Sequence, residues 1–79
     1  MKAYWIVPYG GVTLTLERRG TEPGPVWLQN WIRESLGETR GMNSEDAADK
    51  LMELVLIQWP DRVSAVEVSL NICSYRIES

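Results

Sequence analysis

The sequence predicts a two-layer α+β fold in which two helices cover one face of a three-stranded antiparallel sheet. Three observations support this prediction. An alternating segment follows a pair of glycines near the start, two segments with helical spacing of apolar residues occupy the middle, and another alternating segment lies near the end. The expected order is therefore β-β-α-α-β. At 79 residues the chain has room for a single compact domain, residues 1–79.

The first two strands are expected to form a hairpin. Residues 2–7 are aromatic or β-branched, which is typical of a strand. Residues 8–11, Pro-Tyr-Gly-Gly, predict the turn, because glycine adopts positive φ without steric cost. In residues 12–17 apolar and polar side chains alternate, so we expect a half-buried antiparallel strand.

The first helix is expected at residues 25–36, after a polar connection over residues 18–24. Pro25 suits the first turn of a helix, where its missing N–H costs no hydrogen bond. Apolar residues then recur at a spacing of three to four, and Gly37 follows as the predicted C-terminal cap.

The second helix is expected to begin at a cap formed by Asn43 or Ser44. Pro60 should end it, because proline disfavours the helical conformation of the residue before it. The side chains expected to face the core are those of Ala47, Ala48, Leu51, Leu54, Val55 and Gln58. The third strand is expected over residues 63–77, with a bend or bulge near residues 71–74 because the segment exceeds a typical strand length.

Composition argues against enzymatic activity. The chain has no histidine, which excludes histidine-based acid/base catalysis and ordinary zinc sites, and its single Cys73 therefore has no histidine to activate it. We expect Cys73 to be a packed, inert thiol. A metal site formed by Asp46, Asp49 and Glu53 is disfavoured, because no calcium-binding loop motif is present. No cofactor is expected.

The four tryptophans have two possible roles. They enlarge a core that lacks phenylalanine, or some of them lie exposed in a partner interface, where this residue type is common. A stacking platform for nucleic acid is disfavoured, because the lysines and arginines that line such platforms are missing.

Charge is unevenly distributed and indicates a basic partner. The net charge is −3, and residues 38–53 alone carry −3, whereas residues 1–37 carry +1 and residues 54–79 carry −1. Direct nucleic-acid binding is therefore not expected. The acids of this segment are either a solvated face or a ridge that docks on a basic protein surface. The candidate partner-binding residues are Glu38, Glu45, Asp46, Asp49, Glu53 and Asp61.

In size, acidity and β-β-α-α-β order, the chain resembles the small anti-CRISPR proteins of bacteriophages that act on type I systems, type I-C included. No diagnostic motif contributes to this resemblance. It implies that surface carboxylates imitate duplex phosphates and block the DNA channel of a type I surveillance complex. A subunit of that complex, Cascade, would be the partner.

Two alternatives remain open at this point. Residues 43–75 have the helix-then-strand order of the tunnelling-fold enzymes that handle pterins, but the histidine that such sites commonly use is missing. An oligomeric structural or antitoxin-like interaction module is the better alternative. A monomer in the cytoplasm of a bacterial host is expected, because the helices cap the inner face of the sheet and no signal-peptide pattern or membrane span of about 18 apolar residues is present.

Overall fold

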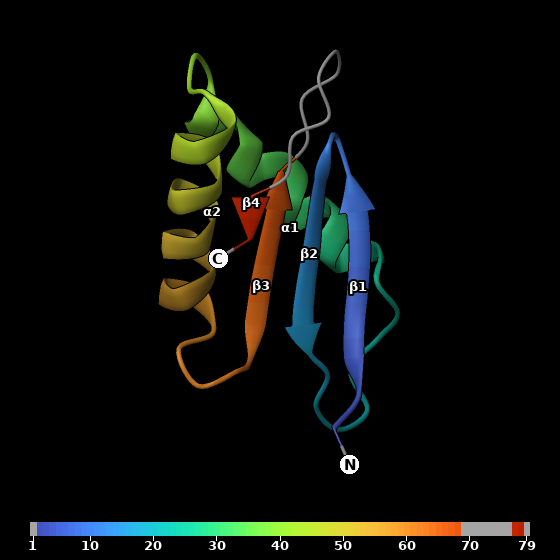
Figure 1. Ribbon diagram of the computed structural model, residues 1–79. Helices are drawn as coiled ribbons and strands as arrows, with labels where there is room; N and C mark the ends of the chain where they lie inside the picture. The colour runs from blue at the N-terminus through green and yellow to red at the C-terminus, as the bar shows by residue number, and fades with distance from the viewer. Residues whose placement is uncertain (1, 69–76, 79) are drawn as a thin grey trace.

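The computed structural model describes residues 2–68 and 77–78. The elements in chain order are β1 (Tyr4–Tyr9), β2 (Val12–Glu17), α1 (Val26–Leu36), the short 3₁₀ helix η1 (Gly37–Thr39), α2 (Ser44–Gln58), β3 (Ser64–Val68) and β4 (Ile77–Glu78). The strands form one antiparallel sheet in the order β1-β2-β3-β4, and both helices pack on the same side of it (Figure 1). The predicted α+β class and the order β-β-α-α-β are confirmed, with β4 as a short addition to the three main strands.

The core lies between the sheet and the two helices. Strand β2 alternates as predicted, since Val12, Leu14 and Leu16 all face the helices and are buried. The buried apolar cluster comprises Val7, Val12, Leu14, Leu16, Leu28, Ile32, Ala48, Leu51, Val55, Val66 and Val68. Of the predicted core face of α2, Leu54 is half-buried, whereas Gln58 is exposed, which corrects the prediction for that residue. It is the last residue of the helix, so the packed stripe ends before it.

The tryptophans support the first of their two possible roles. All four are partly buried and pack against the core. The ring of Trp59 lies between two rings of α1, with centroid distances of 5.9 Å to Trp27 and 5.0 Å to Trp31. Because Trp27 and Trp31 are four residues apart, they share one face of α1. The cluster therefore fastens the end of α2 to α1.

The hairpin turn is shorter than predicted. Only Gly10 and Gly11 form it, with φ of 56° and 82°, the positive values that favour glycine. Pro8 and Tyr9, predicted to be part of the turn, continue strand β1 and pair with Thr13 and Val12. The strand tolerates this proline because the backbone nitrogen of Pro8 does not point to β2.

Alternate residues of a strand direct their backbone groups to opposite sides. The Arg18 N–H donates to the Ala3 carbonyl oxygen at 2.8 Å, and Ala3 is directly opposite Arg18 in the register of β1 and β2. The backbone N–H and C=O groups of the odd-numbered residues of β1 therefore point to β2. Those of the even-numbered residues point to the free edge of the sheet. The Pro8 nitrogen points to that edge, so its missing proton removes no bond of the ladder.

Two glycines shape the connection between the helices. Gly37 is the C-terminal cap of α1 as predicted, but its φ of −58° is right-handed and not the left-handed value that glycine caps often adopt. The chain instead continues into η1, and Gly41, with φ of 80°, makes the change of direction before α2.

The predicted third strand is two strands. β3 ends at Val68, and Ile77 pairs with Val68 in an antiparallel arrangement, so the chain has reversed its direction between them. Alternation alone could not reveal this, because it continues unchanged on either side of a reversal. The predicted bend at residues 71–74, and Cys73 with it, lies outside the described residues.

Asn43 begins α2, as one of the two predicted caps. Its side-chain oxygen Oδ1 accepts a hydrogen bond from the Asp46 backbone N–H at 2.8 Å. We expect Asn43→Ala to lower the free energy of unfolding by about 1 kcal/mol, because this N–H loses its partner. Urea denaturation measures the change, and Asn43→Asp should retain most of the stability. Equal stability of Asn43→Ala and the parent chain would contradict the role of the cap.

Candidate partner-binding surface

Four carboxylates lie exposed along α2: Glu45, Asp46, Asp49 and Glu53. We call these four residues the acidic face. Their position follows from the helix itself, since Ala47, Ala48, Leu51 and Val55 turn the opposite side toward the sheet and are buried. At about 100° per residue the four acids span about 100° of the helix circumference. They therefore form one surface on the side of α2 that is turned away from the core.

Within the part of the chain that the structure describes, the acidic face is nearly free of internal ion pairs. Its one pair joins Lys50 Nζ to Glu53 Oε1 at 4.0 Å, and both side chains remain accessible to solvent. For Glu45, Asp46 and Asp49 no ion pair occurs within residues 2–68 and 77–78. These charges are thus available to an external partner, and the like charges at Glu45–Asp49 and Asp49–Glu53 weaken the helix by about 0.2–0.5 kcal/mol each.

The two flanking candidates are placed differently. Glu38 lies exposed in η1, on the connection that leads to α2. Asp61 follows the opposite end of α2, where its Oδ2 accepts a hydrogen bond from Arg19 Nη1 at 2.9 Å and its carbonyl oxygen accepts another from Arg19 Nη2 at 2.8 Å. Asp61 therefore forms an internal ion pair with Arg19 and is not part of the acidic face.

Asp61 belongs to an ion network that fastens the connection after β2 to the loop before β3. Glu17 is buried, and its carboxylate is held by Lys2 Nζ and Arg19 Nε, each at 3.0 Å. Glu22 pairs with Arg62 Nη1 at 3.0 Å. Hydrogen bonds from Lys2 and then Arg19 lower the pKa of Glu17, and that from Arg19 lowers the pKa of Asp61. The bond from the Arg19 backbone N–H is the main reason that the pKa of Glu22 is lowered.

These shifts predict acid sensitivity. A carboxylate whose pKa is lowered by folding stabilises the protein above the pKa of its unfolded form, and this stabilisation is lost as pH falls through the folded-state pKa. We expect the urea midpoint to decline below about pH 4. The double variant Glu22→Gln with Asp61→Asn should be less stable at pH 7 and decline less on acidification. Parallel decline of variant and parent would show that other groups cause the acid sensitivity.

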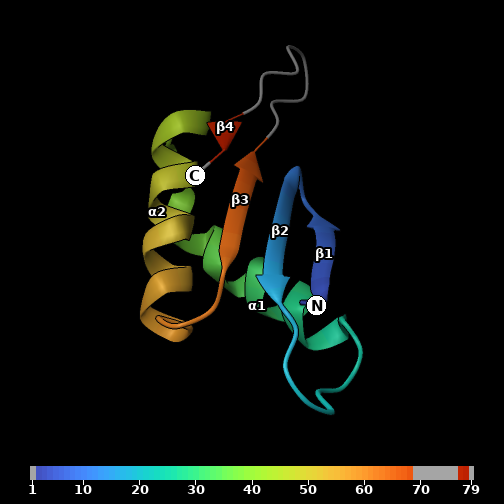
Figure 2. The same ribbon diagram turned by 60° about the horizontal axis from the view of Figure 1, so that its bottom comes forward.

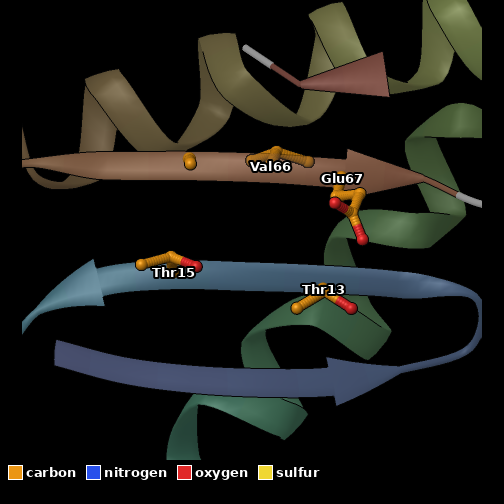
Figure 3. Close-up of a pocket in the computed structure, with 5 residues that line it drawn as sticks. Thr13, Thr15, Val66 and Glu67 are labelled. Carbon is orange, nitrogen blue, oxygen red and sulfur yellow. The ribbon is translucent and has the colours of Figure 1, made fainter. Parts of the chain in front are cut away.

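The described residues contain one shallow depression, on the face of the sheet opposite the helices (Figure 3). Its volume is about 160 Å³, and it is lined by Thr13, Thr15, Ala65, Val66 and Glu67. Sites for small molecules usually measure about 300–1,000 Å³ and combine several converging polar groups. This depression offers two hydroxyl groups and one carboxylate in a smaller space, so it does not form a ligand pocket.

The described part of the chain has neither a metal-binding cluster nor a membrane-spanning helix. No group of three or more acids or cysteines is placed to hold a metal ion, so Asp46, Asp49 and Glu53 do not converge. No helix has the length and apolarity needed to span a bilayer. Hence the acidic face remains the candidate surface.

Sequence reasoning missed several exposed apolar side chains. Leu56 and Ile57 are exposed near the end of α2, beside the acidic face, and Ile6 is exposed on strand β1. For Leu56 and Ile57 the helical spacing could have predicted the exposure, since both residues lie off the buried stripe formed by Leu51 and Val55. For Ile6 no such signal was available, because an apolar run gives no indication of which of its residues face outward.

Comparisons with known proteins add no identification. No protein-family model, no curated protein and no solved structure matches the chain.

Proposed function

We propose that this protein is a non-enzymatic inhibitor that occupies the DNA-binding surface of a partner protein through its acidic face. The resemblance to anti-CRISPR proteins makes a type I surveillance complex the first target to examine. Support comes from a single rigid helix that carries four exposed carboxylates, three of them without an ion pair in the described residues. A basic channel that accepts duplex DNA has the complementary charge.

The observation that carries the proposal is the linear charge density of the acidic face. Glu45 and Glu53 are eight residues apart, which corresponds to about 12 Å along a helix. Four carboxylates over this length give about one charge per 3–4 Å, which is close to the one charge per about 3.4 Å of a single DNA strand. The axial charge density of the acidic face is therefore comparable to that of one DNA strand.

The experiment is a competition for DNA. A purified type I surveillance complex is mixed with a fluorescent target duplex, and the protein is titrated while the bound fraction of the duplex is measured. We expect excess protein to displace the DNA. Bovine serum albumin, which is acidic but unrelated, serves as the control for non-specific charge effects. DNA binding that stays unchanged in excess protein would overturn the proposed function for this target.

A second candidate function, an oligomeric interaction module, is favoured by a separate observation at the far edge of the sheet. Strand β1 has no charged residue, lies at the edge of the sheet and exposes Ile6. Such an edge is a template for pairing with another strand. If the protein binds no basic partner but forms a stable oligomer, this candidate replaces the first.

A further inference from the structure

Strand β1 leaves a row of backbone groups without a strand partner. The register places the odd-numbered residues of β1 against β2, so Tyr4, Ile6 and Pro8 direct their backbone groups to the free edge. Because proline has no N–H, this edge offers two donors, the N–H groups of Tyr4 and Ile6, and three carbonyl acceptors. At the opposite edge β4 pairs with β3, so β1 is the longer unpaired strand of the described sheet.

The side chains of this edge suit association. Alternation places Tyr4, Ile6 and Pro8 on the face of the sheet that no helix covers. Tyr4 is 41% exposed and Ile6 is 67% exposed, high fractions for an aromatic and an aliphatic side chain within a strand. The usual protections of an edge are a charge, above all a lysine, and a proline. Tyr4–Tyr9 has no charge, and Pro8 near its end removes one donor but leaves those of Tyr4 and Ile6.

We propose that β1 pairs with β1 of a second copy of this chain, in an antiparallel arrangement centred on Ile6. The two Ile6 residues then exchange both of their N–H to C=O bonds. Each Tyr4 N–H donates to the Pro8 carbonyl of the other copy, so all four donors of the joint edge are satisfied. Only the Tyr4 carbonyl lacks a partner, because it would face the proline nitrogen, and at an exposed edge water can serve it.

A second copy supplies the complementary edge itself, because each free donor of one β1 meets a free carbonyl oxygen of the other. A shift of the centre by two residues to Tyr4 would use the Lys2 backbone and place each Lys2, which is needed by Glu17, at the interface. A shift to Pro8 would leave the centre without any donor. The Ile6-centred register instead sets the two exposed Ile6 side chains against one another and each Tyr4 against a Pro8, which removes apolar surface from water.

Charge does not oppose this association. Helix α2 packs along β3, whereas β1 forms the other edge of the sheet, beyond β2 (Figures 1 and 2). A dimer through β1 therefore holds the two acidic faces at its far ends and leaves both accessible. The inference therefore specifies the second candidate function, the oligomeric module, and does not depend on the proposed inhibitor function.

The test uses charge at the centre of the dimer. Ile6→Lys and Ile6→Glu each place two like charges opposite one another, whereas an equimolar mixture of the two variants places opposite charges there. Sedimentation equilibrium over about 10 µM to 1 mM, where small interfaces associate, should show the parent chain approaching twice its 9.0 kDa mass. Each variant alone should dimerise at least about tenfold more weakly, and the mixture should recover association.

The matched control is Ile57→Lys, the same substitution at an isoleucine of α2 that is 70% exposed. It should dimerise as the parent does. The amide protons of Tyr4 and Ile6, followed by NMR, should exchange more slowly as the concentration of the parent rises and not in Ile6→Lys. A parent that stays at 9.0 kDa throughout would overturn the proposal. So would a dimer that Ile6→Lys leaves intact, or one that Ile57→Lys disrupts equally.

Discussion

Replacing Leu51 by alanine should remove a large share of the free energy of unfolding. Leu51 is 1% exposed and lies on the side of α2 that packs against the sheet. Truncating a fully buried leucine costs about 2–5 kcal/mol, because the lost contacts add to the cost of the cavity that remains. A domain of this length has a total stability of only about 4–12 kcal/mol.

Leu56 provides the control for this substitution. It lies on the same helix and is 47% exposed, so Leu56→Ala removes the same atoms with much less lost packing. Urea denaturation followed by tryptophan fluorescence measures both variants, since Trp59 changes its environment on unfolding. We expect the loss for Leu51→Ala to exceed that for Leu56→Ala by about 2 kcal/mol or more. Equal losses would show that α2 is not seated on the sheet as described.

The triple change Glu45→Ala, Asp49→Ala and Glu53→Ala should weaken partner binding strongly without harming the fold. Alanine favours helix, and the two like-charge pairs disappear, so the free energy of unfolding should stay within about 1 kcal/mol of the parent value. Three lost ion pairs of about 0.2–1 kcal/mol each correspond to a loss of affinity of up to about a hundredfold. Isothermal titration calorimetry against the surveillance complex measures this loss.

A charge-matched variant separates the surface from the net charge. Asn30→Lys with Glu34→Lys changes two exposed residues of α1 and shifts the net charge by the same three units as the triple change. We expect this variant to bind nearly as tightly as the parent. If both variants lose affinity equally, overall charge and not the acidic face determines binding.

The elements that could be predicted are those whose pattern repeats locally. The alternation in β2 and the cap at Asn43 depend on neighbouring residues, and both agree with the structure. The errors arose where the deciding contact is distant. Pro8 is accepted in a strand because its nitrogen faces an unpaired edge, and the sequence does not show which strand lies at an edge.

In the candidate surface, too, features set by local spacing could be predicted and those set by distant contacts could not. Glu45, Asp49 and Glu53 were predicted to share one side of a helix, because their spacing alone determines it once the helix forms. Asp61 could not be assigned in this way. Its partner Arg19 is forty-two residues away in the chain, and only the packing of the two loops brings the carboxylate to the guanidinium.

The central claim is that the acidic face takes the place of DNA on a basic surface, and a side-by-side competition tests it most directly. The parent chain, the triple alanine variant and the α1 charge-matched variant are each titrated against the surveillance complex bound to fluorescent duplex. We predict that the parent and the α1 variant displace the DNA at similar concentrations, about threefold to a hundredfold lower than the triple variant requires, and that added salt reduces this advantage. Displacement by the triple variant at the same concentration as the parent would contradict the claim.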